Sequence, residues 1–370
     1  MERIFFDNNA TTKLSEAARS AIFDSYKTPL NSSSIHSFGR EANKIYNQTK
    51  NEIINLLNAK NYQIIFTSGG TEANNLAIFG LPNYQIITSG LEHPSIYDPA
   101  IKRKAIITKV NSNGIIDMED LKEKIDNINT PNFLVSIMLA NNETGAIQPI
   151  KEIAKLVHAK NGLIHSDLAQ GIGKIEIDLE DLNIDIAGIS AHKFGGPQGV
   201  GALLARVGID LEPIILGGGQ EGGKRAGTTN ISGIAGLGAA CQNASARIKK
   251  NQNLIELRNY LETSLKTIGG NNIIVLSETT QRLPNTSLIA TTGISNQIQL
   301  IDFDLNGIAV SIGSACSSGR AKPSRVLQAM NIDDTLIKST IRISLGTDNN
   351  KTEIDKFIEV WSKLYKRIHN

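Results

Sequence analysis

The sequence predicts an α/β protein in which a doubly wound sheet is followed by a smaller α+β unit. Two observations support this class. Seven short segments rich in β-branched residues are apolar on both faces, which is typical of strands in a buried, mostly parallel sheet. Segments with apolar residues at helical spacing lie between them, and this alternation changes after residue 250. We therefore expect a large domain over residues 13–250 and a small C-terminal domain over 251–370, with residues 1–12 packing near the small domain.

The strands of the large domain are expected at residues 62–67, 84–88, 105–110, 133–139, 163–166, 184–190 and 201–206. Its helices are expected over 42–57, 150–159 and 231–250, where apolar residues recur at helical spacing. In the small domain the pattern predicts helices over 254–268, 296–305 and 354–368, and strands over 273–276, 287–290, 309–312 and 340–344.

Composition excludes several classes of function. The chain has 370 residues, which suggests about two domains, and 40% of its residues are apolar, which is enough for a sizeable core. Its net charge is +2 without a basic tail or acidic run, so we expect no direct binding to nucleic acid or membrane. Cys241 and Cys316 are its only cysteines, and residues 1–7 lack a signal-like apolar run, so a reducing cytoplasm is expected. Two cysteines and six histidines without ligand spacing predict no metal site.

The most informative segment is SAHKFGGP at residues 190–197, in which Lys193 follows a predicted strand within a Gly/Pro-rich turn. A lysine held there suits a Schiff base to an aldehyde cofactor, and Asp167 at the end of the preceding strand suits a partner for a pyridinium nitrogen. Gln170 could donate to a phenolic oxygen of that cofactor, and Ser190 and His192 could reach its phosphate. The alternative is that Asp167 only caps the next helix.

Three further polar segments follow predicted strands. Gly70 and Thr71 begin a helix after strand 62–67, where free N–H groups favour a phosphate, although ordinary helix capping explains the same residues. His93 could stack on a planar cofactor and transfer protons, or be a structural histidine of the turn. Asn142 could bind a ligand or be part of a polar turn.

Two residues of the C-terminal third carry the remaining chemistry. Arg342 lies within a predicted strand, where either a substrate carboxylate or an internal salt bridge would compensate its charge. Cys316 has only Gly, Ser and Ala around it, so it is expected to be an accessible nucleophilic thiol. Cys241 is expected to be a small buried residue of a helix. The glycine-rich run at 217–223 lacks the context of a dinucleotide fingerprint.

In this order and spacing, these residues resemble the NifS/IscS-like cysteine desulfurases, class V of the pyridoxal-phosphate aminotransferases. The resemblance covers nearly the whole chain and includes FDNNATT at residues 6–12 and SSIHSFGR at residues 33–40. It departs from the usual family pattern at Ser32, where proline is frequent, and at Gly222, where arginine is usual. It implies fold type I, with a mostly parallel seven-stranded sheet in the large domain and a smaller α+β C-terminal domain.

The resemblance implies a complete set of roles. Lys193 would bind pyridoxal 5′-phosphate covalently, with His93 stacked over the ring, Asp167 on its nitrogen and Gln170 on its phenolic oxygen. The phosphate would be held by the remaining cofactor residues, Gly70, Thr71, Ser190, His192 and Thr228, with Thr228 coming from the second subunit of a homodimer. Asn142, which would also contact the cofactor, and Arg342 would orient the carboxylate of L-cysteine.

The implied reaction converts L-cysteine to L-alanine and leaves the sulfur as a persulfide on Cys316. A sulfur-acceptor protein, either an iron–sulfur scaffold or a tRNA thiolation enzyme, would then receive it. Two alternatives are another class V enzyme, such as a selenocysteine lyase or an aminotransferase, and a non-catalytic scaffold. Cys316 argues against the first, because transamination needs no thiol, and the combination of Lys193, Asp167 and His93 argues against the second.

Overall fold

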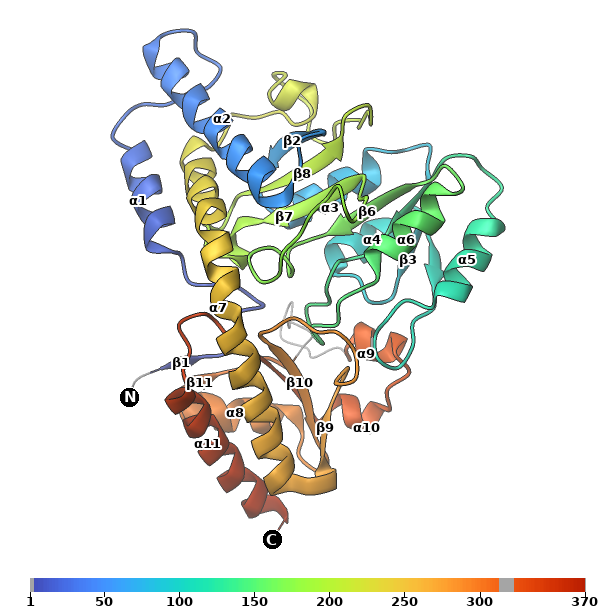
Figure 1. The fold of residues 1–370 in the computed structure, drawn as a ribbon, viewed down its shortest axis with the longest axis vertical. Coiled ribbons are helices and arrows are strands. Elements are labelled where there is room, and N and C mark those ends of the chain that lie inside the picture. Colours follow the sequence, from blue (N-terminus) through green and yellow to red (C-terminus); the bar gives the residue numbers. More distant parts are fainter. Residues whose placement is uncertain (1–2, 313–322, 370) are drawn as a thin grey trace.

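The computed structural model describes residues 3–312 and 323–369, and its centre is a seven-stranded sheet (Figure 1). The strands follow the order β2-β8-β7-β6-β5-β3-β4, and β3 to β7 run parallel while β8 is antiparallel to both of its neighbours. This confirms the predicted fold class. The strand bounds are β2 (Tyr62–Thr67), β3 (Gln85–Ser89), β4 (Ile106–Thr108), β5 (Phe133–Ser136), β6 (Leu163–Asp167), β7 (Ile186–Ser190) and β8 (Gly201–Arg206).

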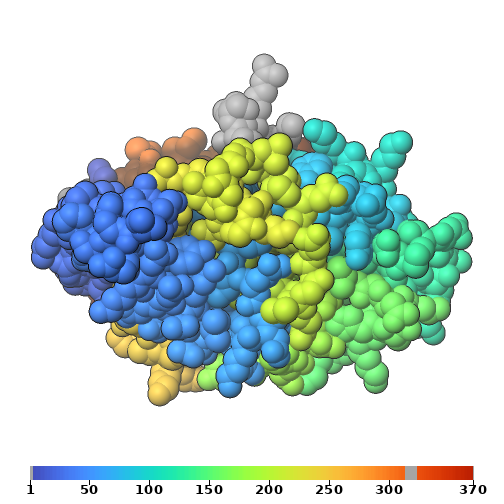
Figure 2. All heavy atoms as spheres, turned by 90° about the horizontal axis from the view of Figure 1, so that it is seen from above, coloured from blue at the N-terminus to red at the C-terminus, as the bar shows by residue number. Residues whose placement is uncertain are grey.

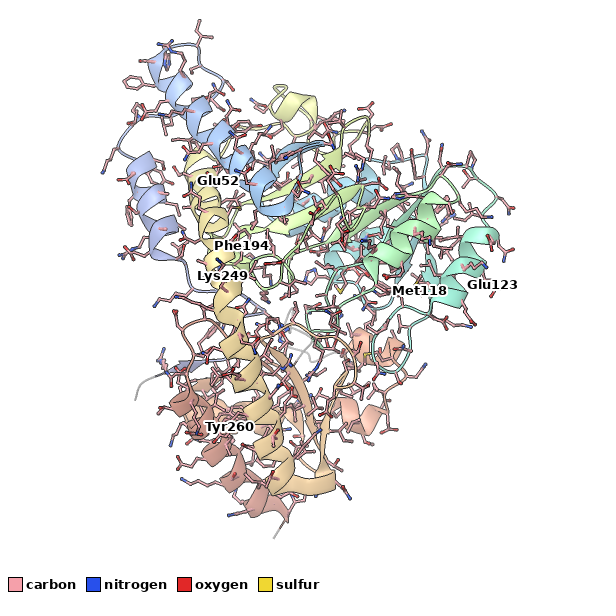
Figure 3. The ribbon with its side chains drawn as sticks, in the orientation of Figure 1. Glu52, Met118, Glu123, Phe194, Lys249 and Tyr260 are labelled. Carbon is pink, nitrogen blue, oxygen red and sulfur yellow. The ribbon has the colours of Figure 1, made fainter. Side chains whose placement is uncertain are left out.

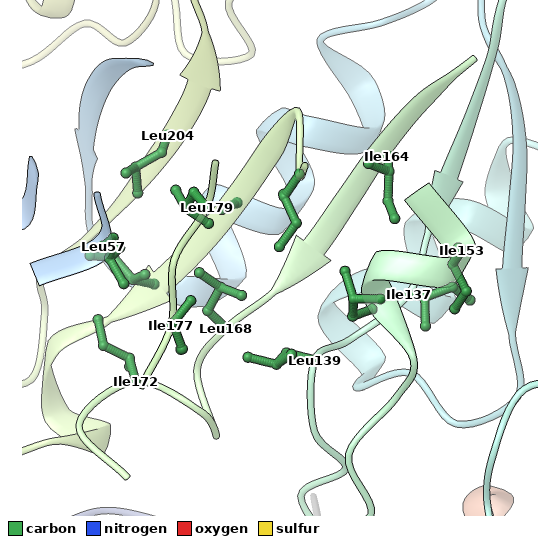
Figure 4. Packing of buried hydrophobic residues seen from close by; sticks show 14 of the residues in the cluster. Leu57, Ile137, Leu139, Ile153, Ile164, Leu168, Ile172, Ile177, Leu179 and Leu204 are labelled. Atoms are coloured by element: carbon green, nitrogen blue, oxygen red, sulfur yellow. The ribbon is translucent and has the colours of Figure 1, made fainter. Parts of the chain in front are cut away.

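Helices cover both faces of this sheet. On one face, α3 (Gly70–Phe79) and α4 (Pro94–Lys102) enclose a core with the sheet residues Ile86, Leu134 and Leu203. The opposite face carries α2 (Ser37–Leu57), α5 (Met118–Asp126) and α6 (Ile150–His158), above the larger cluster shown in part in Figure 4. The strands are buried on both sides, which explains why their sequences are apolar without alternation.

The long helix α7 (Ile231–Gly269) corrects one expectation, because two separate helices were predicted over this stretch. Residues 245–253 contain neither proline nor glycine, so nothing in the backbone ends the helix between them. Its first half packs on α1 (Glu16–Ser25) and α2, where Gln242 donates to Glu52 at 2.9 Å. Its second half packs on α11 (Lys351–His369), where Tyr260 donates to Asp355 at 2.7 Å (Figure 3). One rigid element therefore connects the two sheet systems.

The C-terminal part contains a second sheet of order β12-β10-β9, formed by β9 (Ile273–Val275), β10 (Thr286–Thr291) and β12 (Thr340–Ser344). The N-terminal strand β1 (Ile4–Phe5) pairs in parallel with β11 (Ile308–Ala309), and Asp7 forms a bridge with Ser344. The chain then runs from this region to the large sheet. The remaining helices are α8 (Asn296–Leu305), α9 (Arg325–Ala329) and α10 (Asp334–Ile337). Within the described residues, no helix has the length and apolar character needed to cross a membrane.

Candidate functional site

A cavity of about 680 Å³ lies at the carboxyl ends of the central strands. The structure brings together there nearly all of the residues that the sequence singled out. Thr228 is exposed and lies outside the cavity lining of this chain. Cys316 falls outside the described residues. The predicted residues that line the cavity are Gly70, Thr71, His93, Asn142, Asp167, Gln170, Ser190, His192, Lys193 and Arg342.

Asp167 is the last residue of β6 and is 7% exposed. Its Oδ2 accepts from Asn74 Nδ2 at 2.8 Å, and its Oδ1 accepts from the N–H of Ala169 at 2.8 Å. Both donors are neutral, and in the described part of the chain no cation forms an ion pair with this carboxylate. Capping of the following turn, the alternative interpretation, is therefore present but uses one oxygen. A cationic ligand would complete the site, since buried charges require compensation.

His93 is connected to Asp167 through two residues that the sequence analysis missed, Ser95 and Asn74. His93 Nδ1 lies 2.8 Å from Ser95 Oγ and accepts from the Ser95 N–H at 3.2 Å, while Asn74 Nδ2 donates to Ser95 Oγ at 2.9 Å. Burial lowers the pKa of His93, which favours the neutral ring. Because Nδ1 accepts, the proton of that ring resides on Nε2.

Lys193 ends a 3₁₀ turn (Ala191–Lys193) directly after β7. Its Nζ donates to the backbone oxygens of Asn9 at 2.7 Å and Ala10 at 2.9 Å. Burial, and next the nearby Arg342, lower the pKa of Lys193 to about 8. About a tenth of this amine is therefore unprotonated at pH 7, far more than for an ordinary lysine, and able to attack a carbonyl carbon.

The helix α3 begins beside β7 with Gly70 and Thr71 in its first turn. A Cβ added to Gly70 would lie 3.3 Å from the Cβ of Ser190. A side chain at position 70 would therefore crowd Ser190 on the same side of the cavity. Burial, and next Lys193, lower the pKa of His192 to about 4, which makes the ring neutral at pH 7. Free N–H groups of the first turn, two hydroxyl groups and a neutral ring suit an anion such as phosphate.

Arg342 lies in the middle of β12 and is 4% exposed. One terminal nitrogen forms a 2.6 Å ion pair with Asp7, and the other donates to the backbone oxygen of Asn142 at 3.0 Å. The salt bridge that the sequence left as an alternative is therefore present. Its Nε is buried and has no hydrogen-bond partner among the described residues.

These groups fit pyridoxal phosphate. The buried Asp167, which has only neutral donors, suits the ring nitrogen, and the Lys193 amine suits the aldehyde carbon. The edge formed by Gly70, Thr71 and Ser190 suits the phosphate.

Comparisons with known proteins agree with this geometry. The family model "Aminotransferase class-V" matches residues 4–357. The curated "Cysteine desulfurase IscS" of Clostridium botulinum is 37% identical, over 99% of this chain and 95% of that protein, and the "Cysteine desulfurase" of a Nostoc species is 38% identical, over 100% and 94%.

Solved structures are also similar. The NifS-like protein from Rickettsia africae has a TM-score of 0.92 and 37% identity, over 99% of this chain and all of the other. A structure described as SspA in complex with cysteine has a TM-score of 0.80 and 29% identity, over 94% and 99%. The chain therefore belongs to the class-V aminotransferase family, whose members depend on pyridoxal phosphate.

Proposed function

We propose that this chain is a pyridoxal-phosphate-dependent cysteine desulfurase, which converts L-cysteine to L-alanine and transfers the sulfur to Cys316. The observation that carries the proposal is the convergence of Lys193, Asp167, His93 and Arg342 on one cavity. Relatives that match the chain over nearly its full length bear the name cysteine desulfurase.

Bound pyridoxal phosphate supplies an electrophilic aldehyde carbon and an electron-withdrawing ring. Asp167 would stabilise a protonated ring nitrogen, and Gln170 would donate to the phenolic oxygen. Gly70, Thr71, Ser190 and His192 would hold the phosphate. The unprotonated amine of Lys193 would hold the cofactor covalently and, once released by the substrate amine, would take the substrate Cα proton at Nζ. Arg342 and Asn142 orient the substrate carboxylate, which competes with Asp7 for the guanidinium.

The Cys316 thiolate then attacks the substrate sulfur, so that an S–S bond forms and the carbon–sulfur bond breaks. The electron pair of that bond remains on carbon, which takes up a proton and becomes the methyl group of alanine. Carbon is reduced and the two sulfur atoms are oxidised to a persulfide, so no external oxidant is needed for this half of the reaction. The ring of His93 carries its proton on Nε2, which supports a role for His93 in moving protons at the cofactor.

The experiment is to incubate cofactor-loaded protein with L-cysteine and a reductant, and to measure alanine and sulfide together. We expect equal amounts of both, and loss of both in Cys316→Ala with cofactor binding unchanged. Cys241→Ala is the matched control and should keep the wild-type rate, because Cys241 is buried in α7, where burial raises the pKa of its thiol. Sulfide release that survives Cys316→Ala would contradict the proposed nucleophile.

We also propose a homodimer in which Thr228 completes the phosphate site of the partner. Exposed apolar side chains support it: Tyr26, Ile35 and Leu216 are 73%, 93% and 80% exposed. Figure 2 shows the blue segment that contains α2 beside the yellow segment that follows β8, on one face of the molecule. Light scattering after gel filtration should report a dimer that Leu216→Glu dissociates, while Leu305→Glu, which replaces an equally exposed leucine of α8, should not.

For the product sulfur we propose a protein acceptor, either an iron–sulfur scaffold or a tRNA thiolation enzyme. Protein preloaded with ³⁵S from labelled cysteine should pass the label to one of these on mixing. Label that leaves only as free sulfide would contradict a dedicated protein acceptor. The cytoplasmic location stays a prediction.

A further inference from the structure

Lys174 is a buried lysine behind the cavity whose charge no carboxylate compensates within the described part of the chain. It is 8% exposed, and its Nζ donates to two neutral oxygens, Asn9 Oδ1 at 2.7 Å and Gln170 Oε1 at 2.8 Å. Burial, then the cations Lys193, Arg342 and Arg247, lower its pKa. Keeping an amine here costs free energy that an apolar side chain of similar length would avoid.

The backbone around Lys174 is held as firmly as its amine. The buried side chain of Asn251 on α7 donates to the Lys174 carbonyl oxygen. This bond fixes the backbone of Lys174 against α7. The buried position of the amine itself is set by its bonds to Asn9 and Gln170.

The partners of Lys174 are the carboxamides of Asn9 and Gln170. Its Nζ determines which atom of each carboxamide, oxygen or nitrogen, faces the lysine. Nζ donates to both carboxamides, so the atom of Gln170 that faces it is the carbonyl oxygen. On the other side, Gln170 Nε2 donates to the backbone oxygen of Asn9 at 3.0 Å, and a carbonyl oxygen only accepts. Both contacts require the same orientation, with one N–H of Gln170 left over for a ligand in the cavity that Gln170 lines.

Asn9 is fixed in the same way. Its Oδ1 accepts from Lys174 and from Asn285 Nδ2, while its Nδ2 donates to Thr286 Oγ1 and to the backbone oxygen of Asn142. The backbone oxygen of Asn9 also accepts a hydrogen bond from Lys193 Nζ, at 2.7 Å. Lys174 therefore supports, through Asn9 and Gln170, two groups that face the cofactor.

We propose that Lys174 is a positioning residue that locks the carboxamides of Gln170 and Asn9, so that Gln170 presents an N–H and not its carbonyl oxygen to the cofactor. This inference rests on the proposed cofactor site. Lys174 does not line the cavity, so it acts through Gln170 and touches no substrate. Without it, only the bond from Gln170 Nε2 to the Asn9 backbone oxygen would oppose a turn of the carboxamide, and a turned Gln170 would present its oxygen to the cavity.

The first test uses apoprotein and thermal unfolding. Gln170→Glu places a carboxylate where Lys174 Nζ now donates at 2.8 Å, and it also replaces the Nε2 donor to the Asn9 backbone oxygen by an acceptor. The contact with Lys174 is therefore measured by comparing two backgrounds. Gln170→Glu should lower the melting temperature much more in the Lys174→Met background, where the carboxylate is unpaired, than in the wild type. An equal change in both backgrounds would overturn the contact. If Lys174→Met does not fold, Lys174→Gln replaces it in the same comparison.

The second test measures cofactor binding to the same variants. Lys174→Met should weaken pyridoxal phosphate about tenfold, as expected for one lost hydrogen bond, and shift the visible absorbance of the bound cofactor. In a Gln170→Ala background the same substitution should change the affinity much less, because Gln170 is gone and only the contact of Lys174 with Asn9 is lost. Equal losses in both backgrounds, or no loss, would overturn the proposal.

Lys124→Met is the matched control, because Lys124 is a partly buried lysine of α5 that pairs with Asp120 at 2.8 Å and lies outside the cavity lining. It should lower stability without changing cofactor affinity or absorbance. Wild-type protein that binds no pyridoxal phosphate would overturn the cofactor site, and with it the role of Lys174 toward the cofactor. The apoprotein cycle would still report whether Lys174 holds Gln170, so the two failures are distinguishable.

Discussion

Asp167 and Arg342 are both buried charged side chains that line the same cavity, but their charges are compensated differently. Asp167 has two neutral donors, Asn74 and the backbone of Ala169, both from the large sheet and its helices. Arg342 comes from the second sheet and already holds a carboxylate, that of Asp7, at 2.6 Å. A cationic ligand would compensate the charge on one side of the cavity, and on the other side a ligand carboxylate would replace that of Asp7. This is the division expected between a resident cofactor and a passing amino-acid substrate.

The largest expected effect comes from removing the negative charge of Asp167. Asp167→Asn keeps the shape and the contact with Asn74 but removes the charge that stabilises a protonated ring nitrogen. We expect alanine release at saturating cofactor to fall about hundredfold or more. A rate within threefold of wild type would show that Asp167 only organises the turn after β6.

The pH dependence of cofactor binding tests the amine between the two sides. Burial lowers the pKa of Lys193 to about 8. The unprotonated fraction of Lys193, and with it the rate at which the cofactor is bound, should therefore rise about tenfold per pH unit below pH 8 and level off above it. Stopped-flow absorbance on apoprotein measures this rate, and Lys193→Ala should show no such visible change. A rate of cofactor binding that keeps rising to pH 10 would mean that the pKa of Lys193 is not lowered.

The lowered pKa of Lys193 also predicts how stability depends on pH. Between pH 8 and 10.5 the folded apoprotein binds fewer protons than the unfolded chain, so its free energy of unfolding should rise with pH across that window.

The exchange predicted for the substrate side is tested by Asp7→Asn. Arg342 would then remain buried without a counter-ion until substrate arrives, so the apoprotein should lose about 2 kcal/mol of stability. The KM for L-cysteine should fall severalfold, because the competing carboxylate is absent. Arg342→Ala should instead raise the KM for L-cysteine, because the group proposed to bind the substrate carboxylate is lost. An increase of KM in both variants would mean that Asp7 assists substrate binding and does not compete with it.

The smallest effect is expected at the link between His93 and Asp167. Ser95→Ala removes the hydroxyl between His93 Nδ1 and Asn74, but the Ser95 N–H still donates to Nδ1. We expect kcat to fall about threefold with an unchanged KM. A loss as large as that of Asp167→Asn would mean that the hydroxyl itself transfers protons.

The same division explains what the sequence could predict. Residues that directly follow strands, such as Asp167 and Lys193, were recognisable because parallel strands gather their carboxyl ends at one edge. Gln170 and Arg342 were singled out as well, but their partners and Lys174 were not, because these contacts join distant segments. Gln170 contacts Asn9 across 161 positions, Lys174 contacts Asn9 across 165 and Arg342 contacts Asp7 across 335. No local pattern encodes such pairs. The undivided α7 was missed because polar residues in its middle resemble a boundary.

The most direct test compares the dissociation constants of pyridoxal phosphate for apoprotein carrying Asp167→Asn or Asp7→Asn, measured by equilibrium titration of fluorescence. Each substitution removes one negative charge, from Asp167 in the cavity lining or from Asp7 behind the lining residue Arg342, so net charge is matched. We predict about hundredfold weaker binding for Asp167→Asn and a change of less than about threefold for Asp7→Asn. Equal losses would contradict the account, because the two carboxylates would then act only as a shared negative field.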